Sequence, residues 1–188
     1  MKLIAFNEIL EGERLTLKVT KPDIKFATDY FNLVEKNHFH LRKWLSWEKG
    51  MKTPEDALKY FFEKEEKTKN KEVVEYGIYF QAEYVGSISM FNINLEHSSC
   101  EVGYWITSDM TGHGIVTEAV KILEKEVFSN WQLNRVQLTC DPDNIASIKV
   151  AEKCGFLLEG LKRKDFFSPY FNHFRDTLIF SKLKSDEI

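Results

Sequence analysis

Hydrophobic and polar residues alternate near the start of the chain and again through its middle. Between residues 14 and 19, Leu15, Leu17 and Val19 alternate with polar neighbours, as they do in a strand with one buried face. Three later stretches are rich in β-branched and aromatic residues and are separated by short polar breaks. These stretches are residues 73–80, 84–94 and 100–106. This arrangement predicts three consecutive antiparallel strands.

Helical patterns fill the chain between the first strand and these three. A proline in the segment 20–23 precedes apolar residues at helical spacing, which predicts a helix start. The core-facing positions of this helix are expected to be Ile24, Phe26, Tyr30, Phe31 and Val34. A second, short helix is predicted over residues 40–47. Thr53 is expected to cap a third helix, which continues through the charged stretch 63–71 as a solvated face.

Helices and strands alternate in the second half of the chain. Apolar residues at helical spacing predict a helix over residues 115–128. The remaining predicted elements are a strand at 135–140, a helix at 145–153 and two final strands at 156–165 and 174–183. This order indicates a mixed α/β fold, with a central, mostly antiparallel sheet of six to seven strands flanked by helices. We expect one domain over residues 1–188.

The composition narrows the range of functions. Of the 188 residues, 43% are hydrophobic, which is ample for a core without a metal or disulfides. A net charge of −3 argues against a general nucleic-acid binder, which needs a clustered basic surface. Cys100, Cys140 and Cys154 form no CxxC pair, so neither a zinc site nor a disulfide framework is expected. The chain shows no signal-peptide pattern and no apolar run of membrane-spanning length, which predicts a soluble, cytoplasmic protein.

Two glycines flank one residue between a predicted strand and a predicted helix. Residues 104–119 read YWITSDMTGHGIVTEA, with Gly112 and Gly114 just before the helix. Glycines let the backbone approach a ligand closely, and the first amides of a helix are unpaired at its positive end. Together these features can bind a pyrophosphate. Taken alone, the same motif is more often a tight turn.

A second group of residues lies at the start of the next predicted helix. Asn144 follows residues 141–143 (DPD) and is positioned to cap the helix, and Ser147 lies one turn later on the same face. Gly155 is expected to end the helix, and Phe156 to begin the next strand. Taken singly, Asn144 is interpreted as an N-cap and Ser147 as a surface hydroxyl.

In their order and spacing, the two groups together resemble the GNAT acetyltransferases. Within that superfamily they are most similar to the branch that acetylates alanine or serine at the N-terminus of ribosomal proteins (the RimJ/RimL type). The resemblance extends from residue 14 to residue 183. Its motifs are EVGYWI (101–106), GHGI (112–115) with TEA (117–119), NRV (134–136), Asn144 with Ser147, EK (152–153) with GF (155–156), and YFN (170–172) leading to Asp176. The resemblance implies a GNAT fold with a splayed strand pair that binds acetyl-CoA.

In that family, the loop that matches residues 111–116 binds the CoA pyrophosphate through backbone amides. Thr111 stands here in place of the frequent Gln or Arg, and Val116 in place of the frequent Gly or Ala. Because the main contacts are made by the backbone, we expect altered affinity rather than lost binding. His113 is expected to be an exposed loop residue near phosphate, neither a catalyst nor a metal ligand. The implied CoA-binding residues are Trp105, Ile106, Thr111, Gly112, His113, Gly114, Ile115, Val116, Asn144 and Ser147.

The resemblance also implies roles for four polar side chains. Asn144 is expected to hold the pantetheine arm or the incoming amine, and Ser147 to protonate or hydrogen-bond the leaving thiolate. Glu101 is the first candidate for the base that takes the proton of the amine, directly or through water. An exposed cross-strand partner is an equally good interpretation of Glu101. Tyr170 is a second candidate, as an acid or a substrate contact, with ordinary packing as its alternative.

The acceptor is expected to be a primary amine bound beside the segment 38–47. This segment matches the helical region that lines the acceptor cleft in the family. Trp44 and Trp47 are candidate walls of a peptide groove, with Glu101 as a further acceptor contact, although two aromatic residues at this spacing also occur as core. An α-amine has a pKa of about 7.7–8.0 and lysine one of about 10.4, so an α-amine is easier to present in neutral form. This favours the N-terminus of a protein.

Several alternatives stay open at this stage. Within the enzyme class, the acceptor could instead be a small amine such as a polyamine, an aminoglycoside or an amino-acid-like toxin. Outside it, the chain could be a CoA-binding module without catalysis. The resemblance implies direct transfer in a ternary complex, with no metal and no cysteine nucleophile. It is also compatible with a homodimer.

Overall fold

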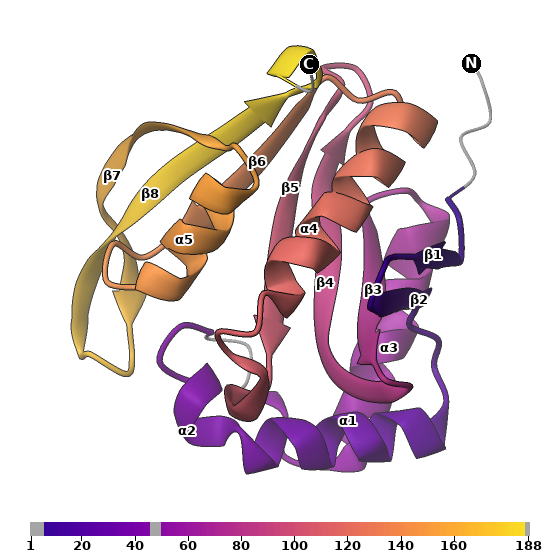
Figure 1. Ribbon diagram of the computed structural model, residues 1–188. Helices are drawn as coiled ribbons and strands as arrows, with labels where there is room; N and C mark the ends of the chain where they lie inside the picture. Colours follow the sequence, from indigo (N-terminus) through magenta and orange to yellow (C-terminus); the bar gives the residue numbers. More distant parts are fainter. Residues whose placement is uncertain (1–5, 46–49, 187–188) are drawn as a thin grey trace.

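One eight-stranded sheet organises the fold (Figure 1). The computed structural model describes residues 6–45 and 50–186. The strand order is β1-β2-β3-β4-β5-β6-β8-β7, and every neighbouring pair except β5 and β6 is antiparallel. The strands are β1 (Ile9–Glu11), β2 (Leu15–Val19), β3 (Val73–Phe80), β4 (Glu83–Asn94), β5 (Ser99–Ile106), β6 (Arg135–Cys140), β7 (Leu157–Ser168) and β8 (His173–Leu183). The predicted mixed α/β fold with a mostly antiparallel sheet is confirmed.

The sheet has more strands than the six to seven that the sequence predicts. The extra strand, β1, contains three residues and pairs with β2 from Ile9 opposite Lys18 to Glu11 opposite Thr16. Three residues are too few to show a period of two, and the side chain of Ile9 is mostly exposed. A hydrophobic pattern therefore could not reveal this strand.

The two long N-terminal helices begin where their capping residues predict. At the start of α1 (Ile24–Lys36), the Asp23 carboxylate accepts a hydrogen bond from the backbone N–H of Phe26. At the start of α3 (Pro54–Lys69), Thr53 and Asp56 cap each other reciprocally. Such caps satisfy backbone donors that have no partner inside the helix.

Two details of the helix prediction are wrong. Ile24 is 52% exposed, because the buried stripe of α1 begins one turn later, at Ala27. The short helix expected at 40–47 is α2 (His38–Leu41), because Asn37 both ends α1 and begins α2. The chain then turns, and residues 46–49 lie outside the described ranges.

Helices cover both faces of the sheet (Figure 1). One layer consists of α4 (Ile115–Lys125) and α5 (Ile145–Lys153), over the larger hydrophobic core. The other consists of α1 and α3, which pack against a second, aromatic-rich core that includes Tyr30, Phe61 and Trp105. The helix predicted at 115–128 continues beyond α4 as one π-helical turn, Glu126–Asn130. No helix within the described ranges is both long and apolar enough to cross a membrane.

The two central strands pair along only part of their length. The parallel register of β5 and β6 runs from Ser99 opposite Arg135 to Val102 opposite Leu138. Beyond that point, residues 103–106 of β5 remain paired with β4, and the end of β6 remains paired with β8. The strands therefore separate in the middle of the sheet, as the sequence resemblance implies. Residues 103–106 keep one backbone edge without a neighbouring strand.

Gly86 holds β4 close to this separated part of β5. A Cβ atom at residue 86 would lie 2.2 Å from the backbone oxygen of Trp105 and 2.9 Å from Cα of Ile106. Gly86→Ala is expected to lower the free energy of unfolding by about 1–3 kcal/mol, because the clash is with backbone that cannot rotate away. A lower urea midpoint would show this. Gly160→Ala is the matched control, because a Cβ there meets nothing within 4 Å; an equal effect of the two substitutions would contradict the explanation.

Candidate active site

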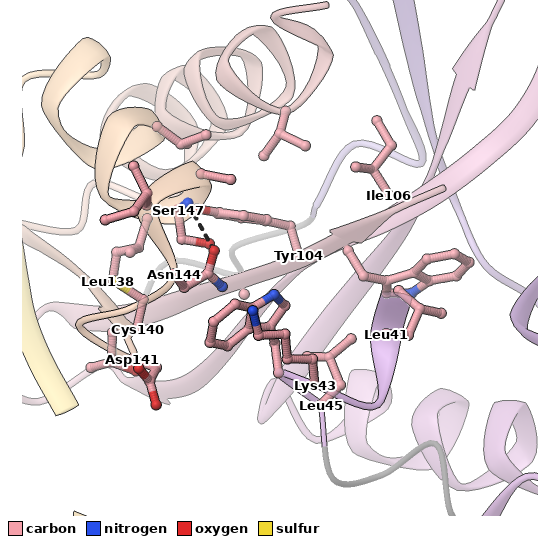
Figure 2. A pocket seen from close by; sticks show the side chains of 18 of the residues that line it. Leu41, Lys43, Leu45, Tyr104, Ile106, Leu138, Cys140, Asp141, Asn144 and Ser147 are labelled. Atoms are coloured by element: carbon pink, nitrogen blue, oxygen red, sulfur yellow. Dashed lines mark hydrogen bonds between the residues drawn. The ribbon is translucent and has the colours of Figure 1, made fainter. Parts of the chain in front are cut away.

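A cleft of about 820 Å³ opens where β5 and β6 separate (Figure 2). It is lined by β5, by the end of β6, by the loop that leads into α4, by α5, by the segment after α2 and by the end of β7. The lining segments fall within residues 102–106, 138–141, 110–117, 144–153, 40–45 and 165–169. Segments that are distant in the sequence thus meet at one gap in the sheet.

The glycine-containing loop lies at one end of this cleft. Gly112 and Gly114 have φ angles of 89° and 75°, a left-handed conformation that favours glycine. Gly114 caps α4 without any side chain, so the first amides of that helix keep no internal partner. A Cβ on Gly112 would meet nothing within 4 Å, which shows that the loop faces open space. Backbone donors at a helix N-terminus beside open space suit a pyrophosphate.

The first β-hairpin holds this loop from outside. Arg14 Nε donates to a carboxylate oxygen of Glu118 at 2.7 Å, and Arg14 Nη1 donates to the backbone oxygen of His113 at 3.3 Å. His113 is exposed and is not a lining residue, whereas Thr111, Gly112, Gly114, Ile115 and Val116 all line the cleft. The exposed position agrees with the expectation for His113.

Asn144 and Ser147 face the cleft from the start of α5 (Figure 2). The side-chain oxygen of Asn144 accepts a hydrogen bond from the Ser147 backbone N–H at 3.2 Å, so Asn144 does cap the helix. Its amide nitrogen points away from that bond in Figure 2, which leaves it available to a ligand. The helix-cap interpretation and the ligand-binding one are thus compatible.

Tyr104 is a polar cleft residue that the sequence did not single out. Its side chain extends from β5 towards Ser147 (Figure 2), and its buried hydroxyl has no hydrogen-bond partner among the described residues. Burial raises the pKa of Tyr104, and an interaction with the Ser147 side chain offsets this only in part. The phenol therefore stays neutral and can donate a hydrogen bond beside Ser147.

The structure brings only some of the predicted catalytic residues to the cleft. Glu101 is not a lining residue, and its carboxylate accepts a hydrogen bond from the side chain of Asn92 at 3.0 Å. Tyr170 lies in the turn between β7 and β8, also outside the lining, with the guanidinium of Arg42 5.3 Å from its ring. Trp44 lines the cleft, whereas Trp47 lies outside the described residues.

Two aspartates line the cleft instead. Asp141 is committed to an ion pair, since Arg175 donates to both of its oxygens at 2.7 and 2.6 Å. Burial would raise the pKa of Asp141, but the hydrogen bonds from Arg175 and from the Asp143 backbone hold it below its usual value. Asp165 has a looser ion pair, in which Lys162 Nζ lies 3.9 Å from one of its carboxylate oxygens. The described residues contain no cluster of side chains suited to a metal ion.

A β-bulge in β7 places Asp165 at the cleft, and the sequence does not predict this bulge. The register of β7 with β8 shifts between Lys162 and Phe166, and Lys164 has a φ of 52°. A bulge of this kind re-aims the side chains beside it. The only sequence signal was an acidic residue within a predicted strand, which has many ordinary explanations.

A family model described as an acetyltransferase (GNAT) domain matches residues 14–157. The chain belongs to the GNAT acetyltransferase family. It is accordingly an N-acetyltransferase, and the resemblance seen in its motifs is confirmed. In the structure, the motifs behind this resemblance correspond to the glycine loop, the separated strands and the Asn144–Ser147 pair.

Relatives and solved structures share most of this acetyltransferase's length. The putative ribosomal N-acetyltransferase YdaF of Bacillus subtilis (strain 168) is 27% identical over 93% of this chain and 94% of that protein. The ribosomal-protein-serine acetyltransferase of Escherichia coli (strain K12) is 29% identical over 73% and 78%, respectively. The microcin C7 self-immunity acetyltransferase MccE, solved in complex with acetyl-CoA and AMP, has a TM-score of 0.82 and 26% identity over 91% of this chain and 93% of that chain. Acetyl-CoA bound to such a neighbour supports acetyl-CoA as the acetyl donor.

Cys140 is a buried free thiol that lines the acetyltransferase cleft. Burial, with a smaller contribution from the charge of Asp141, raises the pKa of Cys140 to about 11. At pH 8 its thiolate fraction should be roughly 100-fold below that of a free cysteine. A colorimetric thiol reagent should therefore react with Cys140 at least that much more slowly than with glutathione, and quickly after unfolding in guanidinium. Cys140→Ala is the control; a fast phase that this substitution removes would contradict the prediction.

Proposed function

We propose that this enzyme transfers the acetyl group of acetyl-CoA to the N-terminal α-amine of a protein, with ribosomal proteins as the first acceptors to test. The observation that carries the proposal is the cleft between β5 and β6, which joins the glycine loop to the segment after α2. The ribosomal-protein acetyltransferases among the relatives support the acceptor. A single domain over residues 1–188, action in the cytoplasm and a homodimer belong to the same proposal and rest on the sequence and the family.

The donor is held mainly by backbone. The amides at the start of α4 take the pyrophosphate, with Thr111 to Val116 shaping the loop. At residues 103–106, which include Trp105 and Ile106, β5 has no neighbouring strand on the side of β6, and this edge lies along the proposed path of the pantetheine arm. The thioester then lies beside Asn144 and Ser147.

In the proposed reaction, the amine attacks the thioester of acetyl-CoA directly. The neutral amine nitrogen bonds to the thioester carbon, the carbonyl oxygen gains negative charge, and the C–S bond then breaks. Ser147 donates a hydrogen bond or its proton to the departing thiolate, and the neutral phenol of Tyr104 donates to Ser147 from behind. The proton lost by the amine passes to a carboxylate at the acceptor side.

Asp165 suits the role of this carboxylate better than Glu101 does. Asp165 lines the cleft, while Asp141 is neutralised by Arg175. Glu101 would need a chain of water molecules or a movement of β5 to reach the amine, since its carboxylate accepts from Asn92 outside the lining. The proposal therefore keeps Glu101 as the alternative base and gives first place to Asp165.

The acceptor class is tested by thiol release from acetyl-CoA with a matched panel. We expect turnover with short peptides that begin with free serine or alanine. The same peptides with a blocked N-terminus and an internal lysine should be inactive, because a lysine amine is almost wholly protonated at neutral pH. Turnover with spermidine or an aminoglycoside instead would move the enzyme to small amines. Binding of CoA without turnover of any acceptor would favour a non-catalytic module.

The base is tested by Asp165→Asn and Glu101→Gln, assayed with the best peptide. Asp165→Asn is expected to lower kcat/KM by roughly 10²–10⁴-fold, the usual contribution of a positioned general base. Glu101→Gln should retain activity within a few-fold, because its amide can still accept the Asn92 hydrogen bond. The reverse order of effects would assign the base to Glu101. Unchanged KM for acetyl-CoA in both variants checks that the donor site is intact.

A further inference from the structure

Arg42 lies on the acceptor side of the cleft and is held there by aromatic rings. Its guanidinium carbon is 4.7 Å from the ring of Phe39 and 5.3 Å from the ring of Tyr170. One terminal nitrogen lies 3.4 Å from Nε2 of His38. Two rings thus fix the position of a half-buried guanidinium that lines the cleft.

The donors of Arg42 are not used up within the protein. Its Nε atom is buried and has no hydrogen-bond partner among the residues that the structure describes. Arg42 forms no ion pair with any carboxylate in those ranges, either. A buried donor on a charged group is costly when it has no partner. An anionic group of a ligand beside the guanidinium would supply the counter-charge that the described residues do not provide.

Several cations around the cleft already have counter-charges, although Lys149 and Lys153 of α5, which also line it, do not take part in these pairs. Arg175 pairs with Asp141 and Asp143, at 2.6 and 2.5 Å. The charge of Lys43 lowers the pKa of Asp141 and so belongs to the same cluster. Arg14 pairs with Glu118 on the far side of the glycine loop. Lys149 and Lys153, which also line the cleft, are exposed residues of α5, whereas Arg42 is half-buried and contacts Tyr170 in the turn between β7 and β8.

Arg42 also lies away from the donor phosphates. Its contacts are with α2 and with the turn between β7 and β8, whereas the phosphate-binding amides belong to the start of α4. Asp165, at the end of β7, is the carboxylate suited to the amine. The acceptor side thus offers a negative group for the amine and a positive group near it.

From this arrangement we infer that Arg42 binds an anionic group of the acceptor, so that the enzyme prefers amines with a carboxylate close by. For a peptide, this is an acidic residue directly after the N-terminal one. Lys43, the neighbouring cation, disfavours a polycation such as spermidine further. The inference rests on the proposed acetyl transfer to an N-terminal amine and specifies which N-termini are chosen.

The test compares peptides that differ only at the second residue. We expect kcat/KM to be about tenfold or more higher for Ser-Asp than for Ser-Ala, and lowest for Ser-Lys, since a charge-assisted bidentate contact is worth at least this factor. Arg42→Gln should remove most of the difference between Ser-Asp and Ser-Ala and leave KM for acetyl-CoA unchanged. Arg42→Lys should restore part of it, because it keeps the charge without the fork.

Lys25→Gln is the matched control, since Lys25 is 87% exposed, pairs with Asp29 on α1 and does not line the cleft. It should keep the full preference. Thermal melting of the Arg42 variants checks that they fold. Equal kcat/KM for Ser-Asp, Ser-Ala and Ser-Lys, or a preference for Ser-Asp that survives in Arg42→Gln, would overturn the inference.

Calorimetry with CoA present separates this inference from the proposed function. Tighter binding of Ser-Asp than of Ser-Ala, lost in Arg42→Gln, supports the anion subsite even if no peptide is acetylated. If the Ser-Asp and Ser-Ala peptides bind equally and are acetylated equally, the inference is wrong but the proposed N-terminal acetylation is not affected. Comparing 2-aminoethyl phosphate with ethanolamine shows whether a phosphate satisfies Arg42 as a carboxylate does.

Discussion

The incomplete pairing of β5 with β6 is the constraint on which the rest of the site depends. Four registered residue pairs join the two strands, and the remainder of each strand is held by its other neighbour. Because β4 and β8 keep the separated ends in place, the gap stays open without collapse of the sheet. Residues 103–106 of β5 then face the gap without a neighbouring strand, and the glycine loop and α5 face the same gap (Figure 2).

Charge around the gap is arranged so that few groups are left without a partner. Asp141, Asp143 and Arg175 form a compact cluster where β6 leads into α5, with Lys43 nearby. This cluster fixes the loop that carries Asn144, so its role is structural support for a residue in contact with the ligand. Among the described residues, two that line the cleft have a buried polar side-chain atom without a hydrogen-bond partner, namely Tyr104 and Arg42.

Local sequence signals predict local structure well, and they lose force where distant strands meet. The helix start in residues 20–23, the cap at Thr53, the glycines before α4 and the spacing of Asn144 and Ser147 all act within a few residues, and all appear where the sequence places them. The direction of a side chain across the sheet depends on register. A bulge in β7 brings Asp165 to the cleft, while a register shift between β4 and β5 after Phe91 leaves Asn92 beside the carboxylate of Glu101. Neither outcome can be derived from the residues themselves.

The glycine loop uses main-chain atoms and the acceptor wall uses side chains, and this difference has an evolutionary consequence. Residues that differ from the frequent ones in the family, such as Thr111 and Val116, leave the backbone amides at the start of α4 in place. The donor site therefore tolerates side-chain substitutions in the loop. A change at Arg42, Trp44 or Asp165, which line the cleft where we propose that the acceptor binds, alters the side chain itself. The donor side of the cleft can therefore stay constant while the side chains on the acceptor side change. Related enzymes that share one donor site can in this way act on quite different acceptors.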